Sequence, residues 1–171
     1  MTQLSAALDP VEFKRFMACW STGVAVVTSA ADDGSPIGCT VNAVTSVSVK
    51  PPLLLVSLAE DSRTLRAIHA RGRLGMNLLP AGGADLARRF ACGSPQERFA
   101  GVEHDWTVGV PMLADVVTSA VCVPRRCFAI ADHVLIVAEP VWWKPVTQQS
   151  PLVSFDRRYW SLPSVAFLGR H

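Results

Sequence analysis

The chain has 171 residues, half of them hydrophobic, with 16 basic and 14 acidic residues and a formal net charge of +2. This length fits one domain and is too short for two cofactor domains, so we expect a single domain over 1–171 with a core at about 13–160. The near-neutral charge does not indicate a nucleic-acid-binding protein, and the mean hydropathy of +0.29 favours an oligomer that covers apolar surface.

Membrane, export and disulfide signals are missing from the sequence. No apolar stretch approaches the roughly 18 residues that span a bilayer, and the N-terminus lacks a basic start followed by an apolar core. We therefore expect a cytoplasmic protein with no membrane span. The odd number of cysteines and the lack of a C-x-x-C pair argue against a disulfide framework or zinc site and predict buried thiols at Cys19, Cys39, Cys92, Cys122 and Cys127.

The first predicted element is a helix that begins after Asp9. Asp9 can cap it, Pro10 suits the first helical position and Glu12 completes a capping box. Apolar residues then recur at helical spacing and predict one strongly apolar face. They are Phe13, Phe16, Met17 and Trp20.

Most of the remaining chain has the pattern of strands. We expect them at 24–29, 37–49, 53–58, 74–79, 116–123, 134–141 and 152–155, with 37–49 a single long or bent strand and 101–112 a loop. Short helices are predicted at 62–70 and 84–91, and a third begins at Ser94. Strands without regular β-α-β alternation favour an antiparallel β-barrel with inserted helices.

Several familiar catalytic motifs do not occur. The sequence contains no G-x-G-x-x-G, no G-x-x-x-x-G-K-S/T, no G-x-S-x-G and no H-E-x-x-H. Its histidines lie without metal-ligand spacing, at His69, His104, His133 and His171. Hydrolase and metalloenzyme functions are therefore disfavoured, and we expect no metal.

Two local features predict a ligand site. Hydroxyl and amide side chains would share one face of a strand at 37–49, with small apolar residues such as Cys39, Val41, Ala43, Val47 and Val49 facing a barrel core. A plain water-facing strand is the alternative explanation. The polar positions are Thr40, Asn42, Ser46 and Ser48.

The second feature is a strand end followed closely by a helix start. Ser57 and Leu58 end the strand, and Ser62, Arg63 and Thr64 open the helix, whose free N–H groups favour a phosphate. A simple N-cap role for Ser62 explains only part of this pattern. Together the two features fit a ligand with a flat hydrogen-bonding head and a phosphorylated tail, as in FMN.

A set of short segments follows one order along about 13–159 and includes Gly38-x-Thr40-x-Asn42-Ala43, Ser62-x-Thr64, Asn77-Leu78-Leu79, Arg98-Phe99-x-Gly101 and Asp132-His133. In this order they resemble the flavin reductase-like family. The resemblance implies a mainly β fold with inserted helices, namely the homodimeric, antiparallel six-stranded FMN-binding split β-barrel. It also implies reduction of FMN or FAD by NADH or NADPH, with the reduced flavin supplied to a partner monooxygenase.

The resemblance also implies roles for individual residues. Thr40, Asn42, Ala43, Ser46 and Ser48 would line the isoalloxazine and ribityl chain, and Ser57, Leu58, Ser62, Arg63 and Thr64 would hold the tail. His133, aided by Asp132, would position the nicotinamide, although a histidine bonded to backbone at a strand junction is the alternative. Phe99 and Tyr159 complete the expected cofactor-binding set.

Three positions depart from the family pattern. Ala131 and Ala138 stand where glycines are usual near His133, and Arg157 replaces a glycine before Tyr159. Alanine would tighten the space if either glycine adopts a positive φ or admits the nicotinamide. These departures favour, as an alternative, a flavoprotein of the same fold with tightly bound FMN and another redox or carrier role. A barrel that binds no cofactor is a third hypothesis.

Overall fold

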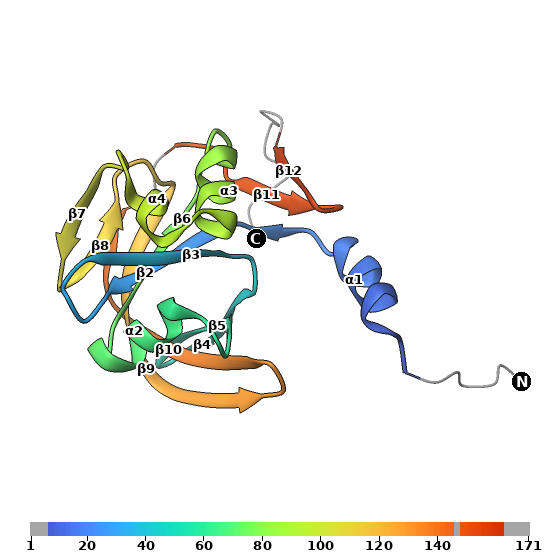
Figure 1. Cartoon of the computed structure of the whole chain (residues 1–171), viewed down its shortest axis with the longest axis horizontal. Coiled ribbons are helices and arrows are strands. Elements are labelled where there is room, and N and C mark those ends of the chain that lie inside the picture. Colours follow the sequence, from blue (N-terminus) through green and yellow to red (C-terminus); the bar gives the residue numbers. More distant parts are fainter. Residues whose placement is uncertain (1–6, 146–147, 163–171) are drawn as a thin grey trace, which may run out of the picture.

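The computed structural model describes residues 7–145 and 148–162, which form a mainly β structure with four short helices among these residues (Figure 1). A seven-stranded antiparallel sheet has the order β3-β2-β6-β9-β10-β5-β4. Its strands are β2 (Ala25–Ala30), β3 (Pro36–Val41), β4 (Val44–Val49), β5 (Pro52–Ala59), β6 (Leu74–Leu78), β9 (Thr118–Ile130) and β10 (His133–Lys144).

Two smaller sheets and the helices complete the fold. One sheet joins β1, β11 and β12, and the other pairs β7 with β8. These strands are β1 (Thr22–Gly23), β7 (His104–Thr107), β8 (Val110–Leu113), β11 (Leu152–Phe155) and β12 (Arg158–Ser161). The helices are α1 (Pro10–Ala18), α2 (Arg63–Arg71), α3 (Ala84–Cys92) and α4 (Pro95–Phe99).

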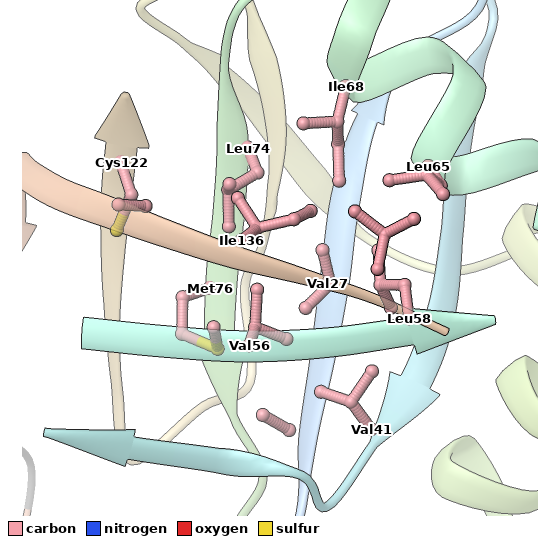
Figure 2. Close-up of a cluster of buried hydrophobic side chains, with 13 residues drawn as sticks. Val27, Val41, Val56, Leu58, Leu65, Ile68, Leu74, Met76, Cys122 and Ile136 are labelled. Carbon is pink, nitrogen blue, oxygen red and sulfur yellow. The ribbon is translucent and has the colours of Figure 1, made fainter. Parts of the chain in front are cut away.

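The main hydrophobic core lies where the large sheet curls around the inner face of α2 (Figure 2). Leu65 and Ile68 of α2 pack there against side chains from β2, β3, β5, β6, β9 and β10. The curl brings opposite ends of the sheet together, since β3 and β4 end the sheet order and only Asn42 and Ala43 connect them. A second cluster packs α3 against β2 and β11, with Phe90 fully buried at its centre.

Helix starts follow the predicted capping signals. Asp9 Oδ1 accepts the Val11 and Glu12 amides at 2.7 and 2.8 Å, and Ser94 forms the same capping box with Glu97. Ser62 caps α2, which ends at Gly72 with φ +65°. These predictions are confirmed because capping depends only on neighbouring residues. The expected apolar face of α1, however, is solvent-exposed in this chain, and the helix stands apart from the sheets in Figure 1.

The prediction of one strand over 37–49 is wrong. The chain leaves β3 at Val41, turns through Asn42 and Ala43, and enters β4 at the opposite end of the sheet. Period-2 alternation is the same in one strand or two, and the turn contains neither glycine nor proline. As a result, Val47 and Val49 of β4, expected in the core, are 51% and 85% exposed.

Two further expectations differ from the structure. The predicted loop at 101–112 contains the β7–β8 hairpin, whose two-residue turn places Val108 and Gly109 at φ +51° and +81°. The cysteines are buried only in part, because Cys19, Cys92 and Cys127 are exposed. No helix among the described residues is long and apolar enough to span a bilayer.

Candidate functional site

A hollow of about 290 Å³ opens where the ends of β3 and β5 approach each other, and we call it the β5 hollow. The short connection from β3 to β4 brings these ends together, and the Ser57–Ala43 hydrogen bond extends the β4–β5 pairing to this connection. Many of the site residues predicted from the sequence line it. The lining consists of residues 39–43 and 57–59 together with Ser62 and His133.

Polar groups surround the β5 hollow. The Thr40 hydroxyl donates to the Ala87 carbonyl of α3 at 2.7 Å, so this side chain is held by its scaffold and keeps lone pairs for a ligand. The Asn42 side-chain amide is exposed and forms no hydrogen bond with the described residues. An apolar wall with polar groups at fixed positions is typical of small-molecule sites.

A second hollow, of about 330 Å³, continues the first, and we call it the α4 hollow. Cys39, Ala59 and Ser62 line both, so the two hollows form one groove along β3. The groove has the size of typical small-molecule sites, roughly 300–1,000 Å³. The remaining lining residues of the α4 hollow are Ile37, Gly38, Asp61, Arg63, Ala91, Pro95 and Arg98.

The N-terminus of α2 lies where the two hollows meet. Ser62 Oγ accepts the Leu65 amide at 3.4 Å, and the first turn of the helix contains no acidic residue. The unpaired N–H groups and the helix dipole therefore favour an anion at this point. Arg63, the first residue of the helix, adds a guanidinium to the same place.

Arg98 is a site candidate that sequence reasoning does not single out. Its Nε donates to the Gly93 carbonyl at 2.9 Å and its Nη1 to the Gly38 carbonyl at 2.8 Å. These bonds fix a half-buried guanidinium in the wall of the α4 hollow. The Arg98-Phe99-x-Gly101 segment marks this region in the sequence, but no neighbouring residue indicates that Arg98, and not Phe99, lines the groove.

Cys39 lies at the junction of the two hollows and was expected in the core. Burial raises the pKa of its thiol, while the adjacent Thr64 hydroxyl and the Arg98 charge oppose that change. Because the pKa is raised, the thiol is neutral at physiological pH and contributes an uncharged contact surface. The Thr64 side chain itself is buried, and its hydroxyl has no hydrogen-bond partner among the described residues.

His133 begins β10 and lines the β5 hollow. Its Nδ1 lies 2.8 Å from Asp132 Oδ1, and this hydrogen bond lowers the pKa of the Asp132 carboxyl below its usual value. The preceding Ala131 has φ +53° in the two-residue turn between β9 and β10. The position is therefore one that suits glycine, as the family pattern indicated.

Several expected site residues lie away from this groove. Ser46 and Ser48 are on β4, and neither lines a hollow with His133 or Ser62. Phe99 packs edge-on against Phe90 in the second cluster, with ring centroids 4.9 Å apart, and Tyr159 lies under Arg88 in the same region. The sequence could not place them because their positions depend on tertiary packing.

The groove can bind a long ligand that has a polar planar head and an anionic tail. Ser57 and Leu58 line the β5 hollow, Arg63 lines the α4 hollow, and Ser62 lines both. The neutral Cys39 surface between the two ends suits a sugar alcohol chain. These residues fit a flavin nucleotide. Within the described residues, no group of three or more His, Cys, Asp or Glu side chains could hold a metal ion.

Proteins of known family resemble this chain over most of its length. The family described as "Flavin reductase like domain" matches residues 17–163. A "Flavin reductase (NADH)" of Kitasatospora aureofaciens is 38% identical over 156 residues, which are 89% of this chain and 81% of that protein. A "Flavin reductase (NADPH)" of Lentzea aerocolonigenes is 39% identical over 137 residues, covering 78% and 79%.

Solved structures of flavin reductases also resemble this chain over most of its length. An NADH:FAD oxidoreductase of Streptomyces globisporus C-1027, in complex with NAD and FAD fragments, has a TM-score of 0.86 at 27% identity and covers 95% of this chain and 100% of that one. The styrene monooxygenase flavin reductase of Pseudomonas putida S12 has a TM-score of 0.80 at 26% identity, with 90% and 99% covered. The similarity thus extends over nearly the whole described chain.

Proposed function

The chain belongs to the flavin reductase like domain family, and from this membership we propose that it reduces FMN or FAD with NADH or NADPH and supplies reduced flavin to a monooxygenase. The groove that joins Asn42 and His133 to Ser62 and Arg63 is the observation that carries the proposal. Relatives named for both NADH and NADPH, and a structural neighbour from a styrene monooxygenase system, support it.

The residues of the groove have binding and orienting roles in this proposal. Thr40, Asn42 and Ala43 would contact the isoalloxazine and ribityl chain, and the α2 N-terminus with Ser62 and Arg63 would hold the phosphate. When bound, the nicotinamide and the flavin would supply the redox chemistry, which is hydride transfer. The protein then needs neither a nucleophile nor a metal, and its contribution is alignment.

His133 would orient the nicotinamide over the flavin. The Asp132 carboxylate occupies Nδ1, so Nε2 is the ring nitrogen left for a ligand. The Asp132 hydrogen bond would keep the ring in one orientation, which is the function of a positioning residue. Ser46, Ser48, Thr64, Phe99 and Tyr159 remain candidates from the resemblance, for which the groove offers no direct support.

The proposed activity is tested with the purified chain. Oxidation of NADH and of NADPH is followed by absorbance with no flavin, with FMN and with FAD. Oxidation that depends on added flavin is expected, and a colourless protein with such activity would use flavin as a substrate. A yellow protein that oxidises neither nucleotide faster with added flavin would contradict the proposal and favour the carrier alternative.

We further propose that the fold is the six-stranded split barrel and that the chain is a homodimer. The two-residue connection through Asn42 and Ala43, which joins the strands at opposite ends of the sheet order, supports barrel closure. Apolar side chains are exposed on α1 and just after its end, such as Phe16 at 66% and Trp20 at 70%, and they support a second copy of the chain as their cover. The cytoplasmic location expected from the sequence stays a prediction.

A further inference from the structure

The α4 hollow extends the groove past the residues that FMN requires. If the ring system lies in the β5 hollow and the first phosphate lies at the α2 N-terminus, FMN ends at Ser62 and Arg63. The α4 hollow, at about 330 Å³ against about 290 Å³ for the β5 hollow, still provides as much space as the ring system uses. A single terminal phosphate would leave most of that space unused.

The charge of the α4 hollow fits a second phosphate. Arg63 and Arg98 both line it, and neither forms an ion pair with a carboxylate among the described residues. Arg98 is held by the Gly38 and Gly93 carbonyls, so it is fixed before a ligand arrives. Two guanidinium groups beside a helix N-terminus match a pyrophosphate, because arginine binds phosphate oxygens in a defined geometry.

The other lining residues fit an adenosine better than a terminal phosphate. Ile37, Ala91 and Pro95 give an apolar surface on which a base can pack. Asp61 adds a carboxylate to the lining of the same hollow. The same carboxylate can accept hydrogen bonds from ribose hydroxyls.

We propose that this chain prefers FAD to FMN, with the second phosphate and the adenosine of FAD in the α4 hollow. The inference rests on the proposed flavin reduction and names its substrate. Arg98 is then a determinant of flavin specificity, because it is the fixed cation of the α4 hollow that lies beyond the α2 N-terminus.

The first test compares riboflavin, FMN and FAD with the unaltered chain. Dissociation constants come from the change in flavin fluorescence, and kcat/KM is measured with saturating NADH or NADPH. We expect FAD to bind about tenfold more tightly than FMN and to have the higher kcat/KM. FMN equal to or better than FAD would overturn the inference while leaving flavin reduction intact. Failure to reduce any of the three flavins would instead reject the proposed function.

Substitutions then test whether the preference for FAD over FMN arises in the α4 hollow. Ala91 is exposed on α3 and lines the α4 hollow, so Ala91→Phe should fold and obstruct that hollow. We expect the ratio of FMN to FAD dissociation constants to fall about tenfold. Ala70→Phe, at an exposed helical position that lines neither hollow, is the matched control. An unchanged ratio in Ala91→Phe would overturn the placement of the adenosine.

The Asp61 carboxylate gives a second, independent test of the adenosine placement. Asp61→Ala removes an acceptor for the ribose hydroxyls of the adenosine, which FMN lacks, and should weaken FAD binding relative to FMN by about threefold to tenfold. An equal change in the dissociation constants of FMN and FAD would contradict this contact. ADP serves as a probe without the flavin ring, since it should compete with FAD but not with riboflavin. Competition of ADP with riboflavin would show that the α4 hollow is not a separate part of the site.

Discussion

The side chain of His133 is 47% exposed and is held by one hydrogen bond to Asp132. Residues with this degree of exposure contribute little to folding stability, so their substitution reports on ligands rather than on the fold. The geometry of the pair within the site depends on Ala131, which starts the turn. His133 thus lines the groove itself, whereas Ala131 sets the backbone conformation of the turn before it.

Replacement of His133 by alanine should weaken the nicotinamide interaction selectively. We expect KM for NADH or NADPH to rise about tenfold and KM for flavin to change less than about twofold. Steady-state kinetics with each substrate varied in turn measure both constants. His69→Ala, an exposed position on α2 outside both hollows, is the control. A larger change in KM for flavin would show that His133 belongs to the flavin contact.

Cys122 provides a pH-dependent prediction. It is buried on β9, and burial raises the pKa of its thiol from 9.0 to about 12. Above pH 9 the unfolded chain loses this proton while the folded chain keeps it, so the free energy of unfolding falls as pH rises towards 12, by on the order of 1 kcal/mol per pH unit. Urea unfolding of the wild type and of Cys122→Ala at several pH values measures the difference. Equal slopes for both proteins would contradict the assignment.

At the scale of elements, the β9–β10 hairpin carries both Ala131 and His133. Its two-residue turn has the conformation in which glycine is usual, because Ala131 has φ +53°. An L-residue in the left-handed region is strained by roughly 1–2 kcal/mol. The hairpin tolerates this strain because β10 is paired on both sides, with β9 and with β5.

Ala131→Gly should therefore stabilise the protein. We expect the free energy of unfolding to rise by about 0.5–1 kcal/mol, since relief of strain exceeds the added chain entropy of glycine in the unfolded state. Ala129 lies two residues earlier, inside β9, and lacks a positive φ, so Ala129→Gly should destabilise the protein by about 0.5–1 kcal/mol. Chemical denaturation of both variants supplies the test, and two changes of the same sign would refute it.

The elements also show how far the sequence predicts the structure. Capped helices such as α2 and α4 are predictable because their signals are local. The break between β3 and β4 is not, because a single asparagine without an adjacent glycine or proline is a weak turn signal, and only the pairing partners reveal the break. The groove is predictable at Thr40, Ser62 and His133, whereas Arg98 is not because it reaches the site from a distant helix.

For the whole molecule, the exposed face of α1 is the feature that needs an explanation. A helix of nine residues is too short to be stable alone in water, and none of its residues is buried in this chain. In the proposed homodimer, a second copy would cover Phe13, Phe16 and Trp20. The dimer would then stabilise the helix, and folding of α1 and association would be coupled.

A charge on this face should dissociate the proposed dimer. Phe16→Glu is expected to raise the dimer dissociation constant at least about 100-fold, because the interface would have to bury an unpaired carboxylate. Size-exclusion chromatography with light scattering should then give the mass of one 18.4 kDa chain. Arg15→Gln, on the opposite face of α1, should leave the mass at twice that value. An unchanged mass for Phe16→Glu would place the interface elsewhere.

The edge strand β4 determines the fate of subunits that have separated. It ends the sheet order, and Val44, Val47 and Val49 expose apolar side chains along it. An open edge with unpaired backbone groups and a valine-rich surface is a template for further strand pairing. Separated subunits should therefore aggregate on warming rather than persist as recoverable monomers. The thermal lifetime of the enzyme would accordingly depend on its own concentration and on the rate of dissociation, not on the unfolding equilibrium of one chain.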